Sequence, residues 1–229
     1  NFEITQIDRD GGLFTVTSAA GDRVRGRYFV NCAGAYADRI AALCDDRFFD
    51  IIPRAGEYLL LDKTEGKTVS HTVFQVPTAN GKGILVTPTA DGNLLLGPTA
   101  QRVPEPDDTV TTAEGLGQVT ALARKSVPSV NTRAVITSFS GVRASTPGGD
   151  FILQRSEKLP QLIHAAAIDS PGLSSCVAIA RYTVGLLREA GLETPENPAF
   201  DGHREDTLAF RRMTDDEKDA YIRQHPAYG

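Results

Sequence analysis

The stretch that most constrains the fold runs from residue 27 to residue 38, with the sequence RYFVNCAGAYAD. Aromatic and β-branched residues end abruptly there in the small residues Ala33 and Gly34, and a helical pattern of apolar positions follows at once. This pattern predicts a strand that passes through a tight turn into a helix. Small residues at such a turn allow a flat ligand to approach closely, and the amides at a helix start favour a negative charge. An ordinary strand-to-helix turn explains the same spacing equally well.

Three short strand-like runs surround the start of this stretch. They cover Phe2–Ile7, Leu13–Ser18 and Arg23–Val30. The intervening residues 10–12 and 21–22 contain Asp-Gly and Gly-Asp, which are turn signals because glycine adopts positive φ without steric cost. We therefore expect a small antiparallel β-meander.

Composition places the chain among ordinary globular proteins and excludes several classes. Its 229 residues are 41% hydrophobic and 23% charged, which is enough for a real core. A net charge of -5 argues against nucleic acid as the main partner. No apolar run approaches membrane-spanning length, and no basic leader precedes an apolar segment. The three cysteines are an odd number without Cys-x-x-Cys spacing, which favours free thiols in a reducing compartment, the cytoplasm.

Short strand-like runs without intervening helices characterise the middle of the chain. Between residues 49 and 100 they alternate with glycine and proline breakers, a pattern typical of an antiparallel sheet. An amphipathic helix over residues 111–127 and a strand over 133–142 follow, and Thr111 with Glu114 is compatible with a capping box. The strand-like runs are Ile51–Leu61, Thr72–Val76, Gly83–Thr87 and Asn93–Leu96.

A second hairpin and a long helix are predicted next. Asp150–Gln154 and Leu162–Ala167 are the paired strands, and an apolar periodicity predicts a helix over residues 170–188. Prolines and an acidic cluster then change the character of residues 194–229. We expect an extended arm with one short helix, Asp215–Gln224, and favour a solvated tail over an interface.

The start of the long helix, DSPGLSSC at residues 169–176, is a candidate anion site. Ser170 suits the N-cap position and Pro171 the first helical position. The small residues that follow leave backbone amides exposed at the positive end of the helix, where a negative charge is stabilised. A well-capped helix with no ligand explains the same residues.

Two segments carry candidate arginines. Arg143 lies in SGVRASTP at residues 140–147, after a predicted strand, and its planar fork suits a carboxylate or a phosphate. A surface arginine and a structural ion pair are the alternatives. In PRAGEY at residues 53–58, Arg54 or Tyr58 is a candidate pocket residue, and a structural role in the sheet is equally compatible.

Other kinds of site are excluded by spacing. No Gly-x-Gly-x-x-Gly follows a predicted strand, Gly81-Lys82 lacks the upstream glycine of a P-loop, and no nucleophile elbow surrounds Ser174 or Ser175. The histidines are too scattered for an evident metal site, so no metal is expected. They are His71, His164, His203 and His225.

The segment VNCAGAYAD resembles the V-N-A-A-G-x-W-A segment of FAD-dependent oxidoreductases of the D-amino-acid oxidase and glycerol-3-phosphate dehydrogenase superfamily. The segments 53–58, 83–100, 140–147 and 170–180 resemble further elements of that superfamily in the same order. The resemblance covers about residues 1–200 by pattern. It is strongest to the branch of anaerobic glycerol-3-phosphate dehydrogenase-like and L-2-hydroxyglutarate oxidase-like proteins.

The resemblance implies two sets of cofactor contacts. Ala33 and Gly34 would contact FAD from the turn. Gly172, Leu173 and Ser174 would contact the pyrimidine end of the flavin ring, mainly through backbone.

It also implies that Arg143 binds the acidic end of the substrate, with Arg54 or Tyr58 lining the same pocket. Two departures concern these residues, because Ala144 stands where the superfamily has proline and Arg54 is one position early. The catalytic base stays unknown.

The implied fold is α+β: an antiparallel substrate-binding sheet with a flanking helix, plus a partial FAD-binding α/β domain. We expect a partial FAD-binding domain in 1–48, the substrate-binding sheet in 49–140, a returning FAD-domain segment in 141–193, and an arm or linker in 194–229. The glycine-rich fingerprint that holds the FAD pyrophosphate in the superfamily is absent. We therefore expect a C-terminal fragment that binds FAD poorly or not at all, with FAD in the full-length parent.

In the parent, the resemblance implies hydride transfer to flavin from a small anionic 2-hydroxy acid or glycerol 3-phosphate. Electrons would pass to a quinone, a protein acceptor or oxygen, in the cytoplasm or at the membrane periphery. An amine or amino-acid oxidase and a non-catalytic subunit-interaction module are the alternatives.

Overall fold

The computed structural model describes residues 2–76, 83–203 and 210–228. It divides into two compact units, residues 1–192 and residues 193–229. The first unit contains three sheets and three α-helices within its described residues, and the second contains one α-helix. Of the glycine and proline breakers expected between residues 49 and 100, Pro77 and Gly81 lie outside the described residues.

The N-terminal meander is present, but the third predicted strand is two strands. β1 (Ile4–Asp10), β2 (Leu13–Ser18) and β3 (Arg23–Gly26) form an antiparallel sheet. The chain then breaks at Gly26, where an added Cβ would lie 3.3 Å from the Tyr28 carbonyl oxygen. The remaining strand, β4 (Phe29–Asn31), joins a different sheet, so the expected strand over 23–30 was wrong.

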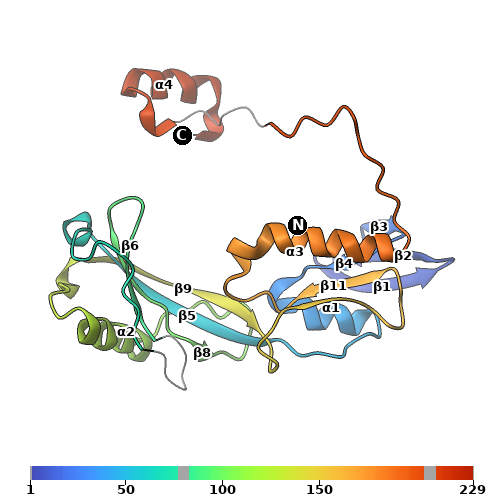
Figure 1. The fold of residues 1–229 in the computed structure, drawn as a ribbon, viewed down its shortest axis with the longest axis horizontal. Helices are drawn as coiled ribbons and strands as arrows, with labels where there is room; N and C mark the ends of the chain where they lie inside the picture. Colours follow the sequence, from blue (N-terminus) through green and yellow to red (C-terminus); the bar gives the residue numbers. More distant parts are fainter. Residues whose placement is uncertain (1, 77–82, 204–209, 229) are drawn as a thin grey trace. The chain divides into compact units, whose positions relative to one another are not determined.

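The second sheet joins segments that are far apart in the sequence. β4 pairs in parallel with β11 (Leu162–Ala166), which pairs antiparallel with β10 (Ile152–Arg155). Figure 1 shows α3 (Gly172–Glu189) on one side of these strands and α1 (Ala37–Leu43) on the other. The sheet is thus covered by a helix on each face, as parallel pairing requires.

The third sheet is entirely antiparallel and confirms the α+β fold class. In it β5 (Ile52–Leu61) pairs with β9 (Val135–Ser145) on one side and with both β7 and β8 on the other. β7 (Leu94–Gly97) pairs with β6 (Leu85–Pro88), and the short strand β8 is Gln101–Arg102.

Three details of this sheet differ from expectation. The predicted strand at 72–76 makes only one isolated bridge, Val73 to Val86. β8 was not predicted, because two residues are too few for a periodic pattern. β9 continues three residues beyond Val142, where the pattern predicted its end.

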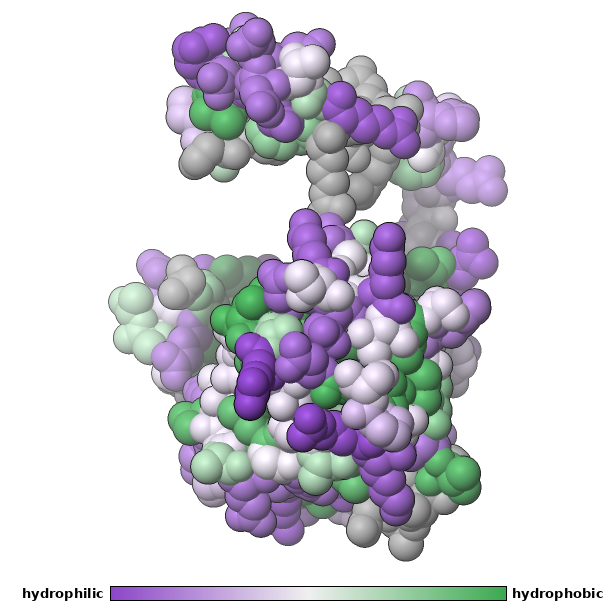
Figure 2. Space-filling model, turned by 90° about the vertical axis from the view of Figure 1, so that its left-hand side faces the viewer, coloured by the Kyte–Doolittle hydropathy of each residue, from purple (hydrophilic) through white to green (hydrophobic). Residues whose placement is uncertain are grey.

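The larger hydrophobic cluster among the described residues of the first unit lies between this sheet and α2 (Ala113–Ser126). Residues that alternate along β5 and β7 are buried against apolar residues of the helix, as period-two side-chain alternation predicts. The buried cluster consists of Leu59, Leu61, Ile84, Val86, Leu94, Leu96, Val119, Ala123 and Val130. The outer surface at the α2 and β6 end mixes polar and apolar side chains (Figure 2).

A buried carboxylate on β5 fixes the start of α2. The N-cap is Thr112, whose hydroxyl accepts from the Gly115 amide, so the capping box expected at Thr111 does not form. Glu57, only 2% exposed, accepts from the Thr112 amide at 2.7 Å and from the Thr112 hydroxyl at 3.0 Å. Gly115 is required there because a Cβ would overlap the Glu57 carboxylate.

The second unit is built around the predicted short helix. α4 (Asp215–Gln224) begins with a capping box in which Thr214 and Glu217 satisfy each other's backbone amides. The rings of Phe210 and Tyr221 are in edge contact with centroids 6.3 Å apart.

Replacing Glu57 by alanine is expected to destabilise the first unit by about 1–3 kcal/mol, because the amide and hydroxyl of Thr112 lose their buried acceptor. The free energy of unfolding in urea measures this loss. Glu114→Ala, an exposed change in the first turn of the same helix, is the control and should stay within about 0.5 kcal/mol of the parent. Equal effects of the two changes would contradict the role of Glu57.

Candidate functional site

The turn after β4 is clamped by one buried side chain. Asn31, 1% exposed, donates from Nδ2 to the Ala37 carbonyl at 2.7 Å and accepts at Oδ1 from the Ala33 amide at 3.3 Å. Gly34 has a φ of +57°, which favours glycine. A short 3-10 turn, Gly34–Tyr36, precedes α1, so the helix begins three residues later than Gly34.

Asn31 is held in turn by a histidine from the neighbouring parallel strand. His164 is fully buried, with Nδ1 3.2 Å from Asn31 Nδ2 and Nε2 3.0 Å from Asp46 Oδ2. An amide nitrogen only donates, so Nδ1 accepts and the ring proton lies on Nε2, facing Asp46. The ring therefore serves as a structural link.

Within residues 2–76, 83–203 and 210–228, no cluster of three or more potential ligands could hold a metal ion.

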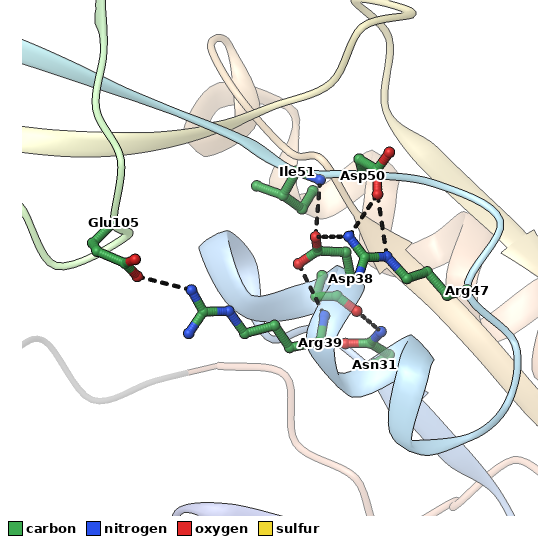
Figure 3. Close-up of polar contacts among 8 residues, drawn as sticks. Asn31, Asp38, Arg39, Arg47, Asp50, Ile51 and Glu105 are labelled. Carbon is green, nitrogen blue, oxygen red and sulfur yellow. Dashed lines mark hydrogen bonds and ion pairs between the residues drawn. The ribbon is translucent and has the colours of Figure 1, made fainter.

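A second carboxylate joins α1 to the start of β5. Asp38, 8% exposed, accepts from the Ile51 amide and from Arg47 Nη2, each at 3.3 Å. Asp50 also accepts from Arg47, at 2.6 Å (Figure 3). These contacts tie α1, which follows the Ala33–Gly34 turn, to β5, the strand that carries Arg54 and Tyr58.

Burial raises the pKa of the Cys32 thiol, which lies in the same turn segment. The neutral thiol therefore predominates at pH 7, so nucleophilic chemistry by Cys32 is disfavoured.

The long helix α3 begins at Gly172, with Pro171 as its N-cap, so Ser170 is not the cap that the sequence suggested. The Gly172 amide donates to the Asp169 carbonyl at 2.7 Å. In the part of the chain that the structure describes, the Leu173 and Ser174 amides have no protein acceptor. Two free donors at the positive end of an 18-residue helix suit a negatively charged group.

Gly172 is needed for packing as well. A Cβ there would lie 2.6 Å from Cγ2 of Ile168. Leu173 is 91% exposed, so the helix start is open to solvent or to a ligand.

The two predicted cofactor segments leave neighbouring parallel strands at the same end. The Ala33–Gly34 turn follows β4, and the loop to α3 follows β11, its parallel partner. Ligands of α/β sheets bind at the carboxyl ends of parallel strands. The structure thus brings Ala33 and Gly34 to the same sheet edge as the segment of Gly172, Leu173 and Ser174.

Arg143 lies near the end of β9 and its guanidinium crosses β5. Nη2 donates to the Thr99 carbonyl at 2.8 Å, and Nε lies 4.0 Å from Oδ1 of Asp169. The path is open because Gly56 has no side chain. A Cβ there would lie 3.2 Å from Arg143 Nη2 and 2.9 Å from Cβ of Pro98.

Asp169 connects this arginine to the helix start. Its carboxylate also accepts from the Ser145 hydroxyl and, at 2.6 Å, from the Ser170 amide. The end of β9 is thereby fixed to the loop that leads into α3.

The three predicted substrate residues share one face of the large sheet. Arg54 lies directly opposite Arg143 in the register, and Tyr58 lies opposite Phe139 with stacked rings 5.1 Å apart. Alternation along β5 puts Arg54, Gly56 and Tyr58 on one face, and Glu57 on the core face. We call the face that carries Arg54, Gly56 and Tyr58 the open face. Sequence reasoning missed Thr99 and Asp169, since a carbonyl acceptor and a lone acid have no pattern of their own.

The family of FAD-dependent oxidoreductases designated DAO matches residues 1–186. The chain belongs to the DAO family. The expected superfamily and branches are confirmed, because the relatives are glycerol-3-phosphate dehydrogenases and oxidases and L-2-hydroxyglutarate dehydrogenases. The unclaimed amides of Leu173 and Ser174 fit a cofactor with an anionic edge, as FAD has in its reduced form.

Among DAO-related proteins, a glycerol 3-phosphate dehydrogenase of Caloramator mitchellensis is 38% identical over 99% of this chain and 47% of its own length. A glycerol 3-phosphate oxidase of Mycoplasma genitalium is 31% identical over 82% of this chain and 50% of its own. The chain therefore spans about half the length of these curated relatives.

A solved structure extends the likeness to three dimensions. The dithionite-reduced L-α-glycerophosphate oxidase of Mycoplasma pneumoniae with FAD bound superposes with a TM-score of 0.76 at 29% identity. It covers 86% of this chain and 52% of the oxidase. The residues 193–229 lie outside the DAO match.

Gly56→Ala is expected to destabilise the chain by about 1–3 kcal/mol, because the new methyl group overlaps Pro98 and crowds Arg143. Gly141, directly opposite on β9, has no heavy atom within 4 Å of a built Cβ and provides the matched control. Gly141→Ala should be neutral or stabilising by about 0.5–1 kcal/mol. Thermal and urea unfolding measure both, and similar losses would show that the open face has no need of glycine at position 56.

Proposed function

We propose that this chain supplies the substrate-binding half of an FAD-dependent dehydrogenase acting on a small anionic alcohol, either glycerol 3-phosphate or a 2-hydroxy acid. The observation that carries the proposal is Arg143, a partly buried guanidinium that Asp169 connects to the loop leading into α3. The names of the relatives support the same substrate class.

In this mechanism Arg143 binds the anionic group of the substrate. The Thr99 carbonyl and the Asp169 carboxylate orient the guanidinium before the substrate arrives, which lowers the entropic cost of binding. Tyr58 and Arg54 line the same face. The Tyr58 ring excludes water from the substrate, and the Arg54 charge replaces water around it.

Ala33, Gly34 and residues 172–174 would hold FAD, which supplies the hydride acceptor when bound. With FAD bound, the free Leu173 and Ser174 amides and the helix dipole would stabilise negative charge on its flavin ring. No described residue is assigned as the base that takes the hydroxyl proton.

The proposal includes polypeptide beyond these 229 residues. The outer side of α3 is apolar and exposed at Leu173, Val177 and Val184, which is a surface that a complete cofactor domain would cover. We therefore propose that this chain alone binds FAD weakly and that the full-length protein binds it tightly. A quinone, a protein or oxygen is the electron acceptor in this scheme.

The proposed compartment is the cytoplasm, because all three cysteines are free. In the described ranges, none of the helices has the length and apolar character needed to cross a bilayer.

The absorption spectrum is the first test. The purified full-length protein is expected to show flavin bands between about 350 and 500 nm after addition of FAD and gel filtration, because the cofactor chemistry resides in the flavin. The 229-residue chain treated in the same way is expected to show none. A full-length protein without flavin bands would contradict the oxidoreductase proposal and favour a non-catalytic interaction module.

Arg143→Ala is expected to lower kcat/KM, because the substrate anion loses its partly buried partner. The decrease should correspond to a loss of about 2–5 kcal/mol in transition-state binding. Steady-state kinetics of the FAD-loaded full-length protein with glycerol 3-phosphate and L-2-hydroxyglutarate measure this change. Glycine and sarcosine test the amine-oxidase alternative in the same assay. Arg133→Ala, at an exposed site just before β9, is the control and should leave kcat/KM unchanged. Unchanged turnover in Arg143→Ala would remove this arginine from the substrate site.

A further inference from the structure

Three arginines form a row across the large sheet. In the register of β5, Arg54 lies opposite Arg143 of β9 on one side and opposite Arg102 of β8 on the other. Side chains directly opposite each other in antiparallel strands project from the same face, with Cβ atoms about 4.5–5.5 Å apart. The register therefore gathers three guanidinium groups on adjacent strands.

The row lies on the open face. Arg143 Nη2 approaches Gly56, two residues along β5 from Arg54 and thus on the same face. Glu57, the nearest carboxylate on β5, belongs to the opposite face and is bonded to Thr112. Its charge therefore lies on the core side of the sheet, away from the row.

The charge of the row is balanced only in part by acidic side chains. Among the described residues, Asp169 at 4.0 Å from Arg143 is the only carboxylate in an ion pair with any of the three arginines. Arg54 and Arg102 are exposed, and the described part of the chain provides neither with a carboxylate within 4.0 Å. Like charges directly opposite each other destabilise a sheet. The row is therefore a local concentration of positive charge on a chain whose net charge is -5, and a bound anion would relieve the repulsion among its guanidinium groups.

We propose that Arg54 and Arg102 act with Arg143 to bind a phosphate monoester dianion and determine specificity for it. This inference rests on the proposed function and selects one of its two substrate classes. A phosphate group carries about 1.5–2 negative charges at pH 7 on three oxygens, which matches several guanidinium forks at one place. A 2-hydroxy carboxylate brings one charge to the same position and needs only Arg143.

The kinetic test uses the FAD-loaded full-length protein with the variants R54Q and R102Q. Each is expected to raise KM for sn-glycerol 3-phosphate by about 10- to 100-fold, the range for a hydrogen bond to a charged group. The value of kcat should change by less than about threefold, because these arginines bind the phosphate in the ground state and the transition state alike. R133Q is the matched control and should leave both parameters unchanged.

A second substrate separates phosphate specificity from a general effect of charge. With a 2-hydroxy monocarboxylate such as L-lactate, R54Q and R102Q are expected to change KM by less than about threefold, because its single carboxylate needs only Arg143. Equal increases in KM for the two substrates would overturn the specificity for phosphate. An unchanged KM for glycerol 3-phosphate in R102Q would remove Arg102 from the site.

A thermal measurement keeps this inference distinct from the proposed function. Inorganic phosphate is expected to raise Tm of the full-length protein, by stabilising the folded state through mass action. The double variant R54Q/R102Q should lose that rise, while R133Q keeps it. If no substrate is oxidised but the rise depends on Arg54 and Arg102, the proposed reaction fails and the anion site stands. A rise that persists in the double variant overturns the site.

Discussion

The parallel pairing of β4 with β11 is the constraint on which the rest of the first unit depends. It joins residues 29–31 to residues 162–164, and the buried Asn31–His164 contact lies at the end of that pairing. Because both strands run in the same direction, the segments that follow them emerge at one edge. The Ala33–Gly34 turn and the α3 start meet there for that reason, and Asp46 completes the buried polar chain through His164. A network of this kind is stable only when every member is satisfied, as it is here.

β5 divides structural and functional roles between its two faces. On the core side, Glu57 holds the α2 start and Leu59 packs in the hydrophobic cluster. On the open face, Gly56 leaves room for Arg143, and Tyr58 stacks on Phe139. The side-chain period of two makes this division possible, because a shift of one residue would exchange every role. Substitutions on the open face can therefore change ligand binding without altering the side chains on the core side of β5.

Much of this arrangement was predictable from local patterns, and the exceptions have identifiable causes. The meander, the antiparallel sheet, α2, α3 and α4 follow from hydrophobic periodicity and turn residues. The strand expected over 23–30 was wrong because those residues include a break after Gly26, where the chain leaves one sheet for another. The N-cap of α2 is Thr112 and not Thr111, and Glu57, a partner distant in sequence, bonds to the amide and hydroxyl of Thr112. The N-cap of α3 is Pro171 and not Ser170. The roles of Arg143, Arg54, Tyr58 and the FAD contacts stay proposals.

Local patterns along the chain were sufficient to indicate strands, helices and the arginine candidates, because turn glycines, alternating strands and helix starts are local in sequence. The DAO family was indicated by the resemblance of its motifs and their order. The register across strands was not available from those patterns. It places Arg102 of β8 beside Arg54, and it brings Asp169 and Thr99 to Arg143. These groups are separated by tens of residues, so their proximity depends on long-range hydrogen bonding and core packing. The composition of the site therefore follows from tertiary structure, while the kind of protein follows from the order of its motifs.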